Sequence, residues 1–69
     1  MKKINEILIF QLTWYMDQWQ KKREVPQELF LAFDDKEQVY FAVDNTTNDF
    51  WLEDFESEEE AIHWLKRYE

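Results

Sequence analysis

The chain has 69 residues and contains no cysteine, no glycine and only one proline. The absence of cysteine excludes disulfides, thiolate zinc sites and thiol redox chemistry, and it leaves the redox compartment open. Without glycine, any turn with a positive φ angle must use another residue, and Asn45, Asn48 and Asp35 suit this role best. The missing residues therefore limit both the chemistry and the turns of this protein.

Serine and histidine are scarce as well, with one residue of each. A nucleophilic enzyme needs Ser, Thr or Cys beside a base that a third group orients. Ser57 is better explained as a helix cap, and His63 is expected at the rim of the same helix. Acidic residues are abundant, but glycosidase chemistry needs one carboxyl group whose pKa is raised by burial, and these acids lie in solvated runs. We therefore expect a protein that is not an enzyme and needs no cofactor.

One segment, from Asp44 to Asp49, carries the oxygen-bearing side chains typical of a calcium loop. An EF-hand loop has a glycine at its sixth position and a glutamate at its twelfth. Counted from Asp44, these positions hold Asp49 and Phe55. The sequence therefore predicts a hairpin loop with Asx turns, and no metal site.

No apolar run approaches the roughly 20 residues that a membrane-spanning helix requires. Met1-Lys2-Lys3 precedes an apolar stretch, as in a signal peptide, but Asn5 and Glu6 interrupt it. No small-residue cleavage site follows either. We expect a cytoplasmic protein without a membrane partner, located in a bacterial host if a phage encodes it.

Basic residues are rare in the second half of the chain. Residues 34–69 hold three bases against twelve acids, a sum of −9, whereas residues 1–33 hold five bases against four acids, a sum of +1. A surface this acidic repels phosphate, so direct nucleic-acid binding is not expected. A basic protein is the partner that the charge favours, and above all one that handles nucleic acid.

Aromatic residues, in contrast, are plentiful, with four Trp, three Tyr and six Phe. A chain of this length hides only about 60% of the surface that it exposes when unfolded. Its stability must come from dense aromatic packing, and dimerisation is the other usual remedy for a small core.

The apolar spacing predicts a long helix over residues 4–22, with Leu8, Leu12 and Tyr15 on its inner face. A second apolar set lies on another side of this helix and forms a candidate dimer face, namely Ile7, Phe10 and Trp14. Residues 7–10 would also suit a strand, which is the main alternative. The helix is expected to end near Lys21-Lys22-Arg23, because cations are stabilised at the carboxyl end of a helix, and Pro26 then closes the segment.

Three apolar runs separated by polar turns predict strands over residues 29–34, 38–43 and 49–55, paired as an antiparallel meander. Ser57 and Glu60 form a capping box, so a short helix is expected over residues 58–68. The prediction is a single small α+β domain with the order α-β-β-β-α. Both helices are expected on one face of the sheet, with the edges of Tyr40 and Trp51 on the other.

This order of elements resembles that of a double-stranded-RNA-binding domain, although that family has a basic cluster where this chain has Glu58-Glu59-Glu60. Residues 39–65 are also similar to the three-strand-plus-helix arm-binding module of phage integrases, in which residues of the types of Phe55, Ser57, Glu60 and Ala61 precede the helix. Both resemblances imply nucleic-acid binding, which the charge of this chain opposes.

In size and charge the chain resembles the small acidic inhibitors of phages, including anti-CRISPR proteins and DNA mimics. We therefore expect an acidic module that occupies a basic nucleic-acid-binding surface of its target. The alternative is a homodimeric structural or regulatory protein that uses the apolar side of the first helix. The acidic binding candidates are Asp44, Asp49, Glu53, Asp54, Glu56, Glu59 and Glu60, and the aromatic ones are Tyr40, Trp51 and Trp64.

Overall fold

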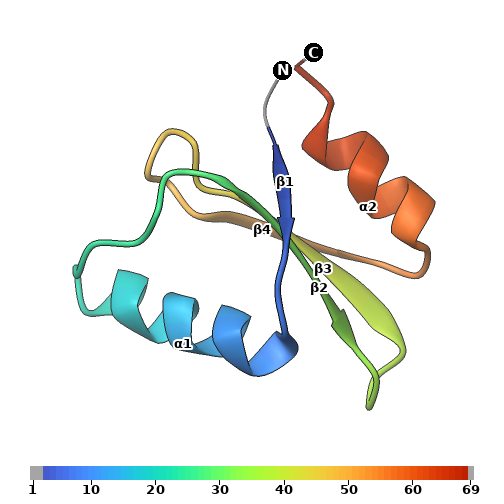
Figure 1. The fold of residues 1–69 in the computed structure, drawn as a ribbon, viewed down its shortest axis with the longest axis horizontal. Coiled ribbons are helices and arrows are strands. Elements are labelled where there is room, and N and C mark those ends of the chain that lie inside the picture. The colour runs from blue at the N-terminus through green and yellow to red at the C-terminus, as the bar shows by residue number, and fades with distance from the viewer. Residues whose placement is uncertain (1–2, 69) are drawn as a thin grey trace.

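The computed structural model describes residues 3–68, which form two helices and a four-stranded sheet (Figure 1). The elements are β1 (Ile4–Glu6), α1 (Ile9–Gln20), β2 (Leu29–Asp34), β3 (Val39–Asp44), β4 (Trp51–Phe55) and α2 (Glu58–Leu65). The α+β class is as predicted, and the three predicted strands are present with boundaries shifted by at most two residues.

The strands lie in the order β1-β2-β3-β4. The pairs β2–β3 and β3–β4 are antiparallel, so the predicted meander is confirmed. The prediction of helix from residue 4 is wrong, because Ile4–Glu6 is a strand that pairs in parallel with β2, with Ile4 opposite Leu29. The Ile7 amide continues this contact by donating to the Leu31 carbonyl at 2.9 Å. Spacing along the chain could not show the strand, because its partner lies 25 residues away.

Helix α1 ends at Gln20 in a Schellman motif that uses lysine where glycine is usual. Lys22 has a φ of 59°. Its amide donates to the Trp19 carbonyl at 3.0 Å, and the Arg23 amide donates to the Gln18 carbonyl at 2.9 Å. The basic run thus follows the end of the helix directly, two residues earlier than predicted.

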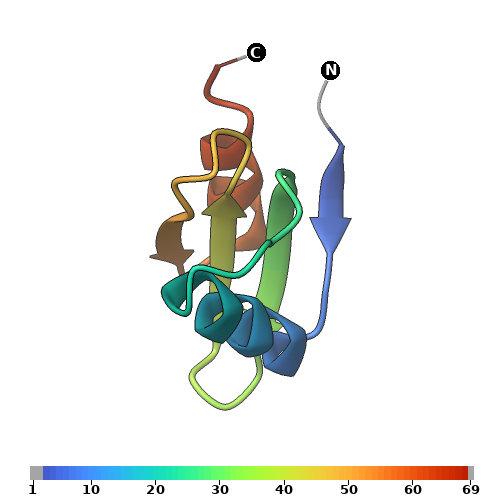
Figure 2. The ribbon, with the colours of Figure 1, turned by 90° about the vertical axis from the view of Figure 1, so that its left-hand side faces the viewer.

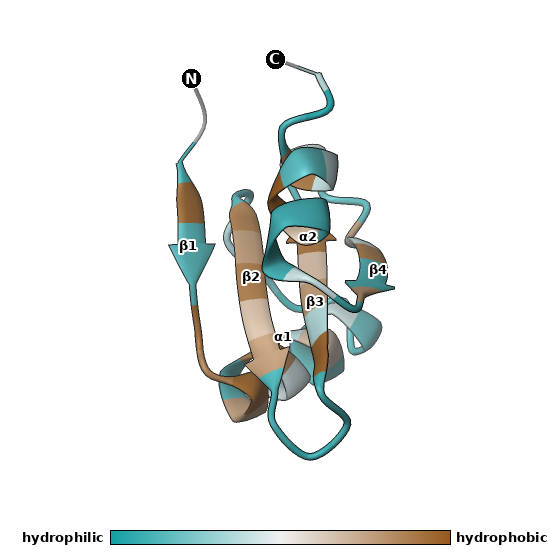
Figure 3. Ribbon diagram, turned by 90° about the vertical axis from the view of Figure 1, so that its right-hand side faces the viewer, coloured by the Kyte–Doolittle hydropathy of each residue, from teal (hydrophilic) through white to brown (hydrophobic). Residues whose placement is uncertain are grey.

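The two helices cover opposite faces of the sheet, and the prediction that both pack on one face is wrong. Helix α1 lies in front of the sheet in Figure 2, and α2 lies in front of it in the opposite view of Figure 3. The core is accordingly divided in two. Phe30 and Val43 belong to the cluster that packs under α1, and Leu31 and Ala42 belong to the cluster that packs under α2. Because β2 and β3 are apolar on both faces, each face needs a cover.

Helix α2 begins as predicted. Ser57 caps it by accepting a hydrogen bond from the Glu60 amide at 3.2 Å, and its hydroxyl donates to the Glu60 carboxylate at 3.0 Å. Ala61 and Leu65 are buried against the sheet. The helix ends at Leu65, three residues before the predicted end.

The loop between β3 and β4 is held by Asn45, which is fully buried. Its amide nitrogen donates to the carbonyls of Pro26 at 2.9 Å and Val25 at 3.3 Å, and its carbonyl oxygen accepts from the Phe50 amide at 3.0 Å. Positive φ angles fall on Lys22, Gln38, Asn48 and Phe50. A positive φ was expected at Asn45, Asn48 or Asp35, and of these three residues only Asn48 has one. Asn45 instead bridges two segments through its side chain.

Candidate binding surface and pocket

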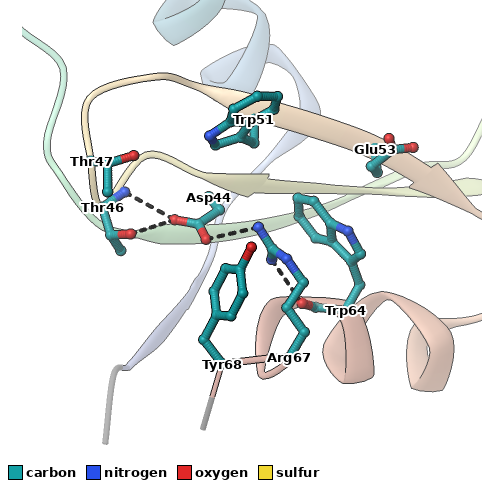
Figure 4. Close-up of a pocket in the computed structure, with 8 residues that line it drawn as sticks. All are labelled: Asp44, Thr46, Thr47, Trp51, Glu53, Trp64, Arg67 and Tyr68. Atoms are coloured by element: carbon teal, nitrogen blue, oxygen red, sulfur yellow. Dashed lines mark hydrogen bonds and ion pairs between the residues drawn. The ribbon is translucent and has the colours of Figure 1, made fainter.

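A pocket of about 430 Å³ lies between β4 and the C-terminal end of α2. Figure 4 shows its eight lining residues. Trp51 and Glu53 come from β4, and Trp64, Arg67 and Tyr68 face them from α2 and the turn that follows it. The pocket therefore joins segments that are separated in the sequence but adjacent on the α2 face of the sheet.

Arg67 is held inside this pocket by aromatic and polar contacts. The carbon atom of its guanidinium lies 4.0 Å from the ring centre of Trp64 and 4.6 Å from that of Tyr68, distances that give cation–π attraction. One guanidinium nitrogen, Nη1, donates to the Trp64 carbonyl at 2.9 Å. The other, Nη2, donates to the Asp44 carboxylate at 3.2 Å. The residues next to Arg67 in the chain do not indicate this role, because Asp44 lies 23 residues away.

Asp44 lies at the end of β3 and is largely buried. Its side chain is 7% exposed, while that of Arg67 is 24% exposed. One carboxylate oxygen accepts from the Thr46 amide at 3.0 Å and from the Thr46 hydroxyl at 2.6 Å, which forms the expected Asx turn. Asp44 was a candidate for partner binding, but the structure places it in these internal contacts, so we leave it out of the exposed acidic surface.

The remaining acidic candidates are all exposed. Glu53 and Asp54 lie on β4, an edge strand of the sheet. They point to opposite faces, because Leu52 packs in the α1 cluster and Phe55 in the α2 cluster. Asp49 precedes β4 and accepts from the Thr47 hydroxyl at 2.7 Å. The other three follow β4, namely Glu56 in the connection and Glu59 and Glu60 in the first turn of α2.

These acids therefore follow one edge of the molecule, which we call the acidic edge: Asp49, Glu53, Asp54, Glu56, Glu59 and Glu60. Because Glu53 and Asp54 point to opposite faces of β4, the acidic edge presents carboxylates toward both sides of the sheet.

The three aromatic candidates have different environments. Trp51 is 58% exposed, although it lies directly beside the pocket. Trp64 is half-buried and packs 6.0 Å from the ring of Phe55. Tyr40 lies at the other end of β3, outside the pocket, where its ring is tilted against that of Phe33 with 4.7 Å between the ring centres. Of the three, Trp51 and Trp64 therefore line the pocket together with Asp44 and Glu53.

The candidate dimer face on α1 is partly accessible. Phe10 is 68% exposed and Trp14 is 57% exposed, one helical turn apart on α1. Ile7 precedes the helix and is half-buried against the core under α1. The exposed part of the candidate dimer face therefore consists of Phe10 and Trp14. Leu8, predicted on the inner face of the helix, is instead exposed at its N-cap.

Neither a cluster of metal-binding side chains nor a membrane-spanning helix is present in residues 3–68. Within residues 3–68, no three His, Cys, Asp or Glu side chains are grouped so that they could hold a metal ion. The helices of this part of the chain are both too short to cross a membrane.

Fold and site together define a small α/β/α sandwich with an acidic edge and an aromatic pocket that already contains a bound guanidinium of its own. No known protein family, curated protein or solved structure matches the chain. The arrangement β-α-β-β-β-α also differs from the α-β-β-β-α order on which the resemblance to RNA-binding domains was based. The function must therefore be inferred from the geometry of the chain itself.

Proposed function

We propose that this protein is a non-enzymatic binding module that inhibits a basic, nucleic-acid-handling protein by occupying its nucleic-acid-binding surface. The observation that supports this most is the acidic edge, six exposed carboxylates along β4 and the start of α2. The small acidic inhibitors of phages, including anti-CRISPR proteins and DNA mimics, act in this way, and the chain resembles them in size and charge.

Part of the acidic edge has a purely local explanation. Two of its members, Glu59 and Glu60, lie in the first turn of α2, where negative charge is stabilised by the helix dipole. Glu53, Asp54 and Glu56 have no such reason to be acidic. A charge of either sign on an edge strand discourages pairing with other sheets, so this role explains a charge at Glu53 and Asp54 but not its negative sign. These three residues therefore carry the proposal.

The test begins with capture of partners from extracts of the native host at low salt. The captured protein is then purified and bound to a fluorescent DNA duplex, and displacement of the duplex is followed by anisotropy. We expect displacement by the native protein and steep weakening of the complex with added NaCl, because exposed charges are screened. Displacement of the duplex should be abolished in the triple variant that combines Glu53→Lys, Asp54→Lys and Glu56→Lys.

A matched control reverses three exposed acids elsewhere: Glu6, Glu24 and Glu28. Both triple variants change the net charge by the same amount, so a difference between them reports position and not total charge. Equal displacement by the two variants, or binding that salt does not weaken, would contradict the proposal.

A second candidate function is that of a homodimeric structural or regulatory protein. The exposure of Phe10 and Trp14 on α1 favours it, because adjacent exposed aromatic residues are typical of interaction surfaces. Light scattering at tens of micromolar should then give the mass of a dimer, and Trp14→Glu should give a monomer. Trp51→Glu is the control, since Trp51 is equally exposed but lies on another face. A monomeric native protein would exclude self-association at this concentration.

A further inference from the structure

The pocket shows how this protein holds a guanidinium group. Arg67 stacks on the Trp64 ring and pairs with the Asp44 carboxylate, so it uses one indole and one acid. Strand β4 presents the same two groups again, as Trp51 and Glu53, on the other wall of the pocket. Among residues 3–68 the ion pairs are Lys21–Asp17 and Arg67–Asp44, and neither involves Glu53.

We infer that this pocket receives an arginine side chain of the protein partner, which stacks on the Trp51 ring and pairs with the Glu53 carboxylate. The inference rests on the proposed function for the basic character of the partner. It adds a defined position on the acidic edge where a single residue of that partner docks.

The geometry of β4 supports this arrangement. Trp51 and Glu53 are two residues apart on a strand, so both side chains leave the same face, roughly 6.6 Å apart. A guanidinium group that lies on the indole can reach a carboxylate at this distance. Trp51 is free to accept it, because within the described residues its ring stacks on no other aromatic ring and is more than half exposed.

The charge of the pocket selects a cation. Asp44 and Arg67 neutralise each other, and Glu53 leaves the lining with an excess of one negative charge. An anionic ligand such as a phosphate would be repelled. The volume of about 430 Å³ leaves room for a long side chain. Arginine fits better than lysine, because a planar guanidinium can stack on an indole and bond a carboxylate through two nitrogens at once.

The experiment titrates the 15N-labelled protein with the peptide acetyl-Gly-Arg-Gly-Arg-Gly-amide and follows amide and indole signals by NMR. A peptide with citrulline in place of arginine has the same shape without the charge. We expect the largest shifts at the Trp51 indole and the Glu53 amide with the arginine peptide, and no saturable shift with citrulline. The Trp51→Leu spectrum identifies the indole signal of Trp51 among the four.

The variants separate docking in the pocket from general attraction to the acidic edge. Glu53→Gln and Trp51→Leu should each raise the Kd of the peptide roughly threefold or more, as expected for loss of an exposed ion pair or cation–π contact. Trp51→Phe keeps a ring and should lie in between. Asp54→Asn removes the same charge one residue away on the opposite face of β4, and it should change the Kd by less than about twofold.

Each contrary outcome points to a different error. Equal weakening by Glu53→Gln and Asp54→Asn, or peptide binding without a shift at Trp51, would overturn the pocket inference and leave the acidic edge as the binding surface. Arginine docking at Trp51 and Glu53 without displacement of DNA in the anisotropy assay would overturn the proposed function and leave the pocket. A peptide that does not bind at all would also overturn the pocket inference.

Discussion

Asn45 offers the sharpest test of how this fold is held together, because a single buried amide joins the segment before β2 to the loop between β3 and β4. We consider Asn45→Ala. The substitution removes one donor that serves the carbonyls of Pro26 and Val25, and one acceptor that serves the Phe50 amide. Since Asn45 is fully buried, water cannot replace these bonds without opening the structure.

The expected loss follows from these three hydrogen bonds. Each is worth a net of about 0.5 to 1.5 kcal/mol, and a buried group left unpaired costs about 1 to 3 kcal/mol. Two bonds are short, at 2.9 and 3.0 Å, and the third is longer, at 3.3 Å. We therefore expect a loss of about 2 to 4 kcal/mol in the free energy of unfolding. For a chain of this length the total is only roughly 3 to 10 kcal/mol, so the variant should be near the limit of folding.

The assay is urea unfolding followed by tryptophan fluorescence. Trp19 stacks on Phe50 at 5.7 Å and therefore reports on this loop. Asn45→Asp keeps the acceptor for Phe50 but places carboxylate oxygen against two carbonyls, so it should destabilise at least as much as alanine. Asn48→Gly is the control, because it removes an exposed amide at a positive φ and should change stability by less than about 0.5 kcal/mol. A loss below about 1 kcal/mol for Asn45→Ala would refute the reasoning.

Two further predictions concern the end of α1 and the pocket. Lys22→Gly should stabilise the protein by about 0.5 to 1 kcal/mol in urea unfolding, because glycine adopts the φ of 59° without steric cost. Lys21→Gly, at a φ of −83°, should not stabilise it, and a gain there equal to that of Lys22→Gly would argue against the motif. For the Asp44–Arg67 pair, a double-mutant cycle with Asp44→Asn and Arg67→Met should give a coupling free energy of about 1 to 3 kcal/mol, which is more than an exposed pair gives. The coupling should persist in 1 M NaCl because the Asp44 side chain is only 7% exposed, and its disappearance in salt would show that the pair is solvated.

Several features were within reach of the sequence because they depend on neighbouring residues. The Ser57 cap of α2, the three meander strands and the Asx turn at Asp44 all involve residues close together in the chain. The uneven distribution of charge is also a property of the sequence, and the proposal of a basic partner depends on it. These predictions needed only propensity, periodicity and the turn chemistry of Asn, Asp and Ser.

What the sequence could not determine depends on contacts between distant segments. Residues 4–6 form a strand only because the edge of β2 is available to them. The apolar spacing that predicted a helix there carries no information about this distant strand. The helices cover different faces of the sheet, and β2 and β3 are buried on both sides as a result. Tertiary structure also brought Arg67 to Asp44 across 23 residues, and so made one acidic candidate internal while leaving Glu53 and Trp51 exposed at the pocket. The sequence by itself determined which charged and aromatic groups this protein has, and only the packing of the two helices on the sheet decided which of them remain on the surface.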